Sequence, residues 1–137
     1  MSKVNKKSLN AFHVNISNYL NIYRDENKFS YACKRVLRNS KNKQDDFMDQ
    51  IEEMKINLGS INEKGNLIIN PSGGYDFTPE NLLKFNKKLK ELEQQEVEID
   101  HYYISSKFIP DTVPFQLKEV LIGFVIDPEE DDKEPEN

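Results

Sequence analysis

The chain has 137 residues, of which 36% are hydrophobic and 31% charged, and 19 lysines and arginines against 24 acidic residues give a net charge of −5. This length predicts one domain, and the low apolar share predicts a thin core. No apolar run reaches the roughly 18 residues of a membrane span, and none follows the N-terminal lysines as in a secretory signal, so we expect a protein that is neither membrane-bound nor secreted.

The first patterned region lies around Phe12. Phe12, Val14 and Ile16 alternate with polar residues, which is typical of a strand. From Ile16 onward apolar residues recur at helical spacing, through Tyr19 and Tyr23. We therefore expect a short strand that runs into a short helix.

A long helix is predicted from about Lys28 to Leu58. Its apolar stripe widens at the start, as expected where a helix meets a core. The polar stretch 39–44 interrupts this stripe and is the point where the helix could bend. The stripe consists of Phe29, Cys33, Val36, Phe47, Ile51, Met54 and Leu58.

Turn-forming residues follow this helix. Gly59 is a suitable helix stop, and residues 62–66 and 71–74 have turn composition on either side of the apolar run 67–69. This arrangement predicts a small β-hairpin, or two short extended pieces, at the end of the helix. We see no internal repeat in the sequence.

The second long helix has the clearest start signal. Thr78 is a good N-cap residue and Pro79 suits the first helical position. Leu82, Phe85, Leu89 and Leu92 then form a heptad stripe of the coiled-coil type. Two long stripes joined by about twenty residues predict an antiparallel helical hairpin over about residues 28–96.

The segment 97–126 is expected to dock on the base of this hairpin. Val97 and Ile99 alternate as in a strand, Pro114 opens a short helix that reaches Leu121, and residues 124–126 read as a final strand. The prediction is an α+β protein, with an elongated antiparallel helical hairpin, a small β-hairpin at its tip and a short mixed α/β base. It forms one domain over residues 1–126.

The remaining residues, 127–137, contain seven acidic side chains, one lysine, two prolines and no apolar residue. Such a segment cannot bury enough apolar surface to offset the entropy of ordering. We expect a disordered acidic tail.

Charge is segregated along the chain. Residues 1–43 carry ten basic and two acidic side chains, whereas residues 44–126 carry eight basic and fifteen acidic ones. Segregated charge mainly steers encounter and selects partners. The basic residues of the first long helix are therefore the candidate partner-binding residues. They are Lys34, Arg35, Arg38, Lys41 and Lys43.

Candidates for chemistry are few. His13 and His101 have no second histidine or cysteine at ligand spacing, and Cys33 lies on an apolar stripe, where a buried thiol is the ordinary explanation. Asp49 and Glu52 share a helix face with Asp45, which indicates a solvated surface more often than a cation site. We predict no catalytic residues, no metal site and no cofactor.

The layout resembles a family of small, functionally uncharacterised proteins of tailed bacteriophages. The resemblance covers about residues 25–126. It rests on Tyr31-Ala32 with Arg35 in the first helix, the turn 62–66, residues 96–99 after the second helix, and Leu117 with Leu121. It implies a phage-encoded protein that acts in the host cytoplasm or in the virion, and it carries no catalytic residues over.

These observations favour a non-enzymatic protein that binds a host factor or a defence component. Two alternatives stay open: a small structural or assembly-accessory component of a virion, and a weak nucleic-acid binder that uses the basic N-terminal third. The pI of about 5.1 makes nucleic acid the less favoured partner. The sequence leaves the oligomeric state open.

Overall fold

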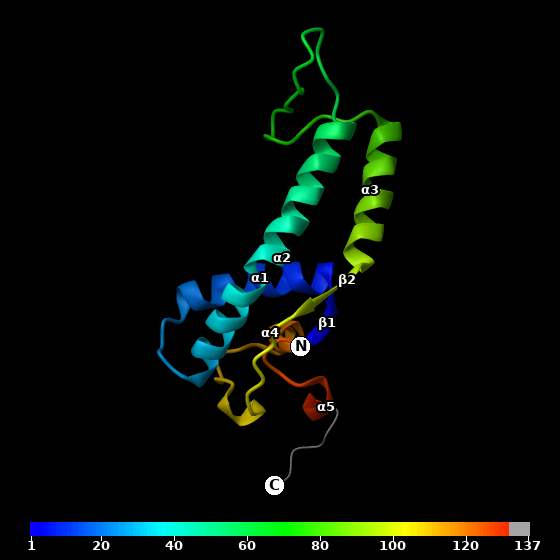
Figure 1. The fold of residues 1–137 in the computed structure, drawn as a ribbon. Coiled ribbons are helices and arrows are strands. Elements are labelled where there is room, and N and C mark those ends of the chain that lie inside the picture. Colours follow the sequence, from blue (N-terminus) through cyan, green and yellow to red (C-terminus); the bar gives the residue numbers. More distant parts are fainter. Residues whose placement is uncertain (132–137) are drawn as a thin grey trace. The chain divides into compact units, whose positions relative to one another are not determined.

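Helices and one small sheet make up the computed structural model of the chain, which describes residues 1–131 (Figure 1). The predicted α+β class is confirmed. In chain order the elements are β1 (Ser2–Asn5), α1 (Lys6–Ile22), α2 (Lys28–Leu58), α3 (Pro79–Gln94), β2 (Glu96–Ile99), the 3₁₀ turn η1 (Ser106–Phe108), α4 (Phe115–Leu121) and α5 (Pro128–Asp131).

The chain divides into two compact units. Unit 1 contains residues 1–44 and the chain from Glu96 onward, and unit 2 contains residues 45–95. Helix α2 begins in unit 1 and ends in unit 2. The single domain expected over residues 1–126 stays a prediction.

The sheet of unit 1 pairs the beginnings of its two chain segments. Strands β1 and β2 are antiparallel, with Ser2 opposite Ile99 and Asn5 opposite Glu96. The alternation that predicted a strand at Val97 and Ile99 is confirmed.

The strand expected around Phe12 is wrong, because this region belongs to α1. The side-chain oxygen of Asn5 accepts a hydrogen bond from the Ser8 amide at 2.7 Å and caps the helix. Leu9, Phe12 and Ile16 are then buried on one face at spacings of three and four. The helical period thus outweighs the short alternation, since only a helix buries all three residues together.

The core of unit 1 combines residues that are far apart in sequence. Phe12 of α1 stacks on Phe124 with 4.4 Å between ring centroids. Leu121, Val125 and Ile126 join the same buried cluster as Phe12. The final strand expected at residues 124–126 is wrong. Gly123 has a positive φ of 89°, and the chain forms a turn whose amides at Phe124, Val125 and Ile126 donate to the Leu121 carbonyl.

Helix α2 has the predicted ends and does not break in its polar middle. Asn27 caps its start, because its side-chain oxygen accepts from the Ser30 amide at 2.8 Å while the Ser30 hydroxyl accepts from the Asn27 amide. Ser40 is fully buried within the polar stretch and donates to the Val36 carbonyl. The helix ends before Gly59, where a Cβ would lie 2.8 Å from the Lys55 carbonyl oxygen.

Unit 2 contains the end of α2, the connection and α3. Thr78 accepts a hydrogen bond from the Asn81 amide and Pro79 is the first helical residue, so the predicted helix start is confirmed. Of the predicted stripe on α3, Phe85 and Leu92 are buried, Leu89 is half-buried, and Leu82 is exposed. The Leu82 part of the stripe prediction is therefore wrong.

The connection at residues 59–78 contains a repeat of eight residues that the sequence analysis missed. The expected β-hairpin is replaced by two tight turns with single bridges, Ile61 to Leu67 and Ile69 to Tyr75. Ser60, Ile68 and Asp76 are eight residues apart and bond in a ring: the Ser60 amide donates to Asp76, the Asp76 amide to Ile68, and the Ile68 amide to Ser60.

The second residue after each ring member is a cap. Asn62 accepts from the amides of Lys64 and Asn66, and Asn70 accepts in the same way from Ser72 and Gly74. Thr78 is the second residue after Asp76, the third ring member, and it caps α3. The same local chemistry therefore closes two turns and starts a helix.

The C-terminal part is only partly described. Helix α4 follows Pro114 and reaches Leu121 as predicted. Pro128–Asp131 form one helical turn, α5, inside the segment expected to be a disordered tail. Residues 132–137 lie outside the described residues, so the disorder of the tail stays a prediction there.

Candidate functional site

Four of the five candidate basic residues share one exposed face of α2 in unit 1. The opposite face is buried and carries Phe29, Cys33 and Val36. At 3.6 residues per turn, the four basic side chains fall on the side away from this core, and all four are exposed. We call Lys34, Arg35, Arg38 and Lys41 the cationic face.

Lys43 does not belong to this face. It lies seven residues, about two turns, after the buried Val36 and therefore on the same side of the helix as Val36. Lys43 itself is exposed. The structure therefore separates one of the five predicted residues from the other four.

Aromatic residues hold Arg35 in place. Its Nη1 donates to the Tyr31 hydroxyl at 3.2 Å, and its guanidinium carbon lies 4.8 Å from the centre of the Tyr102 ring. The rings of Tyr31 and Tyr102 meet edge to face at 5.7 Å. This arrangement orders an exposed guanidinium that would otherwise sample many rotamers.

A shallow pocket of about 520 Å³ adjoins the cationic face, and Tyr31 and Tyr102 line it. Lys28 lies 4.1 Å from the centre of the Phe108 ring, and Lys107 approaches the same ring at 5.2 Å. The surface is thus a set of cations held on aromatic rings. The ion pair between Lys34 and Glu26 at 3.5 Å is exposed on both sides and adds little to stability.

Tyr102 and Phe108 are functional candidates that the sequence analysis did not select. They lie more than sixty residues from Arg35 in the chain, so only the fold brings them together. What marks them is that Tyr31, Tyr102 and Phe108 are exposed beside a basic helix. The order of residues in the sequence does not reveal this arrangement.

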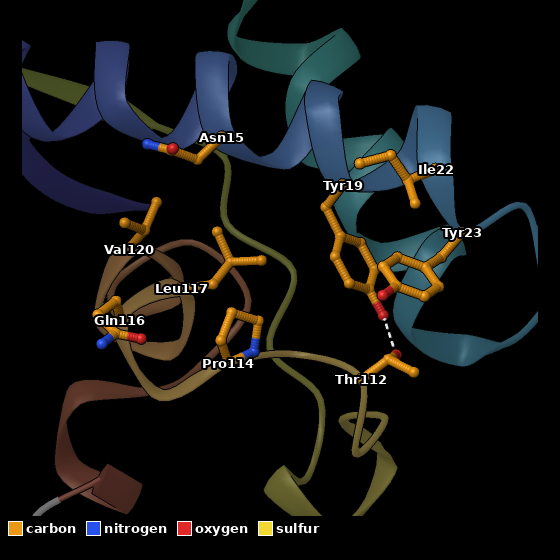
Figure 2. A pocket seen from close by; sticks show the side chains of 9 residues that line it. All are labelled: Asn15, Tyr19, Ile22, Tyr23, Thr112, Pro114, Gln116, Leu117 and Val120. Atoms are coloured by element: carbon orange, nitrogen blue, oxygen red, sulfur yellow. Dashed lines mark hydrogen bonds between the residues drawn. The ribbon is translucent and has the colours of Figure 1, made fainter.

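A second pocket, of about 680 Å³, lies between α1 and the segment that contains α4 (Figure 2). Figure 2 shows Tyr19 bonded to the Thr112 hydroxyl, beside Tyr23, whose ring stacks on Tyr19 at 4.7 Å. Leu117 and Val120 form the facing wall. The lining is mainly apolar and suits an apolar group.

His13 and Ser40 form a histidine–serine pair that the sequence analysis also missed. His13 Nε2 lies 2.8 Å from the Ser40 oxygen, and the Ser40 hydroxyl donates to the Val36 carbonyl at 2.7 Å. A hydroxyl has one proton, so Ser40 accepts from His13. This direction is opposite to the one that activates a serine nucleophile, and the pair ties α1 to α2.

The remaining titratable candidates are buried or stacked. Burial raises the pKa of the Cys33 thiol to about 12, so it stays protonated at neutral pH and is a poor nucleophile. His101 stacks on Tyr103 at 3.7 Å. Burial lowers the pKa of His101 and the N-terminal amine lowers it further, while Asp127 and Asp100 act in the opposite direction.

Metal-binding clusters and membrane-spanning helices are both absent from residues 1–131. Among the side chains that the structure describes, no group of three or more histidines, cysteines, aspartates or glutamates is arranged to hold a metal ion. Within the same residues, every helix is too short or too polar to cross a bilayer.

Comparison with known proteins finds no similar protein. No family model, curated protein or solved structure matches the chain. The resemblance to tailed-phage proteins therefore stays a prediction.

Proposed function

We propose that the chain is a non-enzymatic protein-binding protein whose cationic face, together with Tyr31 and Tyr102, binds an acidic segment of its partner. The observation that carries this proposal is Arg35, which is exposed on α2 and positioned by the Tyr102 ring at 4.8 Å and the Tyr31 hydroxyl at 3.2 Å. Arginine and tyrosine dominate binding energy at protein interfaces, and a positioned guanidinium loses less entropy when it binds a carboxylate.

The same geometry favours a protein over a nucleic acid. Bases stack on exposed aromatic faces. Here Arg35 lies over Tyr102 and Lys28 over Phe108, so the cations of the protein itself cover one face of each ring. The net charge of −5 also opposes binding to a phosphate backbone.

We also propose that unit 2 is the antiparallel helical hairpin predicted from the sequence. Two observations in unit 2 support it: Phe47 on α2 is buried, as are Phe85 and Leu92 on α3, and the Asn81 side-chain amide donates to the Leu58 carbonyl at 3.1 Å. The hairpin pairs the end of α2 with the start of α3.

The resemblance to phage proteins makes a host factor or a defence component, met in the host cytoplasm, the expected partner. The test is affinity recovery of partners with the tagged full chain and with the variant Lys34→Glu, Arg35→Glu, Arg38→Glu. The matched control reverses three exposed lysines of unit 2, in Lys64→Glu, Lys84→Glu, Lys88→Glu.

We expect a protein that the wild type and the control recover equally and that the unit 1 variant loses, with elution by salt. Equal recovery by all three chains would contradict the proposal, provided that circular dichroism shows all three folded. Recovery of nucleic acid in place of protein would favour the alternative function.

A further inference from the structure

Unit 2 has a second patterned face on α2, opposite its buried one. Phe47 is buried and Ile51, Met54 and Leu58 are half-buried on one side. A stripe at spacings of four, three and four runs along the other side, where every member is exposed. The acidic stripe consists of Asp45, Asp49, Glu52 and Ile56.

Helix α3 has the matching stripe. Its outer side, away from the buried Phe85 and Leu92, carries exposed residues at the same spacings of four, three and four. The basic stripe consists of Leu83, Lys87, Lys90 and Gln94. Each stripe thus has an apolar residue at one end and charges of one sign in its middle.

The two stripes are also in register. The bond between the Asn81 side chain and the Leu58 carbonyl joins the end of α2 to the start of α3. Ile56 and Leu83 are each two residues from this bond along their helices. Since an α-helix rises 1.5 Å per residue, the two lie at the same level of the unit.

The charged residues follow the same register. Glu52 and Lys87 are each six residues from the bonded pair, and Asp49 and Lys90 are each nine residues from it. A second copy placed beside the first, without a shift along the helices, would bring Glu52 to the level of Lys87, Asp49 to the level of Lys90 and Asp45 to the level of the uncharged Gln94. Ile56, 48% exposed, would meet Leu83, 73% exposed.

We propose that unit 2 is a self-association surface, in which the basic stripe of one copy packs antiparallel on the acidic stripe of the next. The stripes lie on opposite sides of the unit, so the contact is head to tail and each copy keeps one stripe for a further neighbour. Such heterologous contacts build open chains or rings rather than closed dimers. Because the acidic and basic stripes have opposite charge, equal spacing and the same register, a second copy of this chain is the partner that fits each stripe.

The test measures the mass of the full chain by light scattering from micromolar to millimolar concentration. The wild type should grow beyond a dimer as concentration rises and should shrink in high salt. Asp49→Lys and Lys90→Asp each place like charges at one junction, and each should raise the concentration needed for association about tenfold. Both variants leave Glu52 and its bond from the Tyr75 hydroxyl intact.

An equimolar mixture of the two variants decides the question, because the introduced lysine of one chain then faces the introduced aspartate of the other and association should return. Asp46→Lys and Lys88→Asp carry the same charge changes off the stripes and should associate like the wild type. A monomeric wild type, a dimer that does not grow, a mixture that fails to restore association, or equal loss in the off-stripe controls would overturn the proposal. Circular dichroism confirms that each variant is folded.

Discussion

The two units are stabilised in different ways. In unit 1, α1, α2, β2 and the residues around α4 bury one continuous apolar cluster, with Phe12, Phe29 and Phe124 almost completely covered. In unit 2, the buried apolar residues are Phe47, Phe85 and Leu92, and large apolar side chains such as Leu83 are exposed. Unit 1 therefore depends on tertiary burial, whereas unit 2 depends more on caps and turns and leaves more of its apolar surface exposed.

The largest effect should come from the core of unit 1. Phe12→Ala removes a ring that stacks on Phe124 and is fully buried, so we expect a loss of about 3–5 kcal/mol in the free energy of unfolding. Chemical denaturation followed by circular dichroism measures it. A loss below about 1 kcal/mol would mean that this core does not hold the fold.

The corresponding change in unit 2 should cost less. Phe85 stacks on Phe77 at 5.4 Å but is 9% exposed, so Phe85→Ala should cost about 2–3 kcal/mol. Hydrogen exchange by residue should rise over 45–95 and stay unchanged in the core of unit 1. Uniform acceleration over both units would show that they unfold as one domain.

A helix cap gives a smaller and more local effect. Thr78→Ala removes the hydroxyl that accepts from the Asn81 amide, with an expected cost of about 1 kcal/mol. Thr78→Ser keeps the acceptor and is the control. Exchange of the amides at the start of α3 reports the change, and equal exchange in both variants would exclude the cap.

Titration of His101, in unit 1, should produce the smallest change. Because the fold lowers the pKa of His101 below its usual 6.5, the unfolded chain binds the proton more readily. The stability contribution is complete above pH 6.5 and falls as the pH decreases below it. His101→Gln should flatten this part of the stability–pH curve. An unchanged slope would assign the pH dependence to other groups.

Local signals in the sequence predicted the parts of the fold that local chemistry decides. Thr78 and Pro79 fix the start of α3, and Gly59 fixes the end of α2. The apolar period of α2 was strong enough to identify a helix through its polar middle, although it did not indicate that Ser40 is buried.

Features that depend on distant residues were missed. Strand β1 exists because it pairs with β2, more than ninety residues away, and His13 meets Ser40 only because α1 packs against α2. The eight-residue repeat, in contrast, was visible in the sequence and was overlooked: Ile61-Asn62 recurs as Ile69-Asn70, and a glycine follows each asparagine after three residues. The cationic face was predicted, but the Tyr102 ring that orders it was not.

Under the proposed function, binding depends on a positioned arginine rather than on positive charge alone. The most direct test compares the dissociation constants of Arg35→Lys and Lys43→Gln for the partner recovered with the tagged chain. Arg35→Lys keeps the charge but loses the planar group above Tyr102, so its affinity should fall about tenfold. Lys43→Gln removes a charge outside the cationic face and should bind like the wild type. Unchanged binding by Arg35→Lys together with weakened binding by Lys43→Gln would contradict the account.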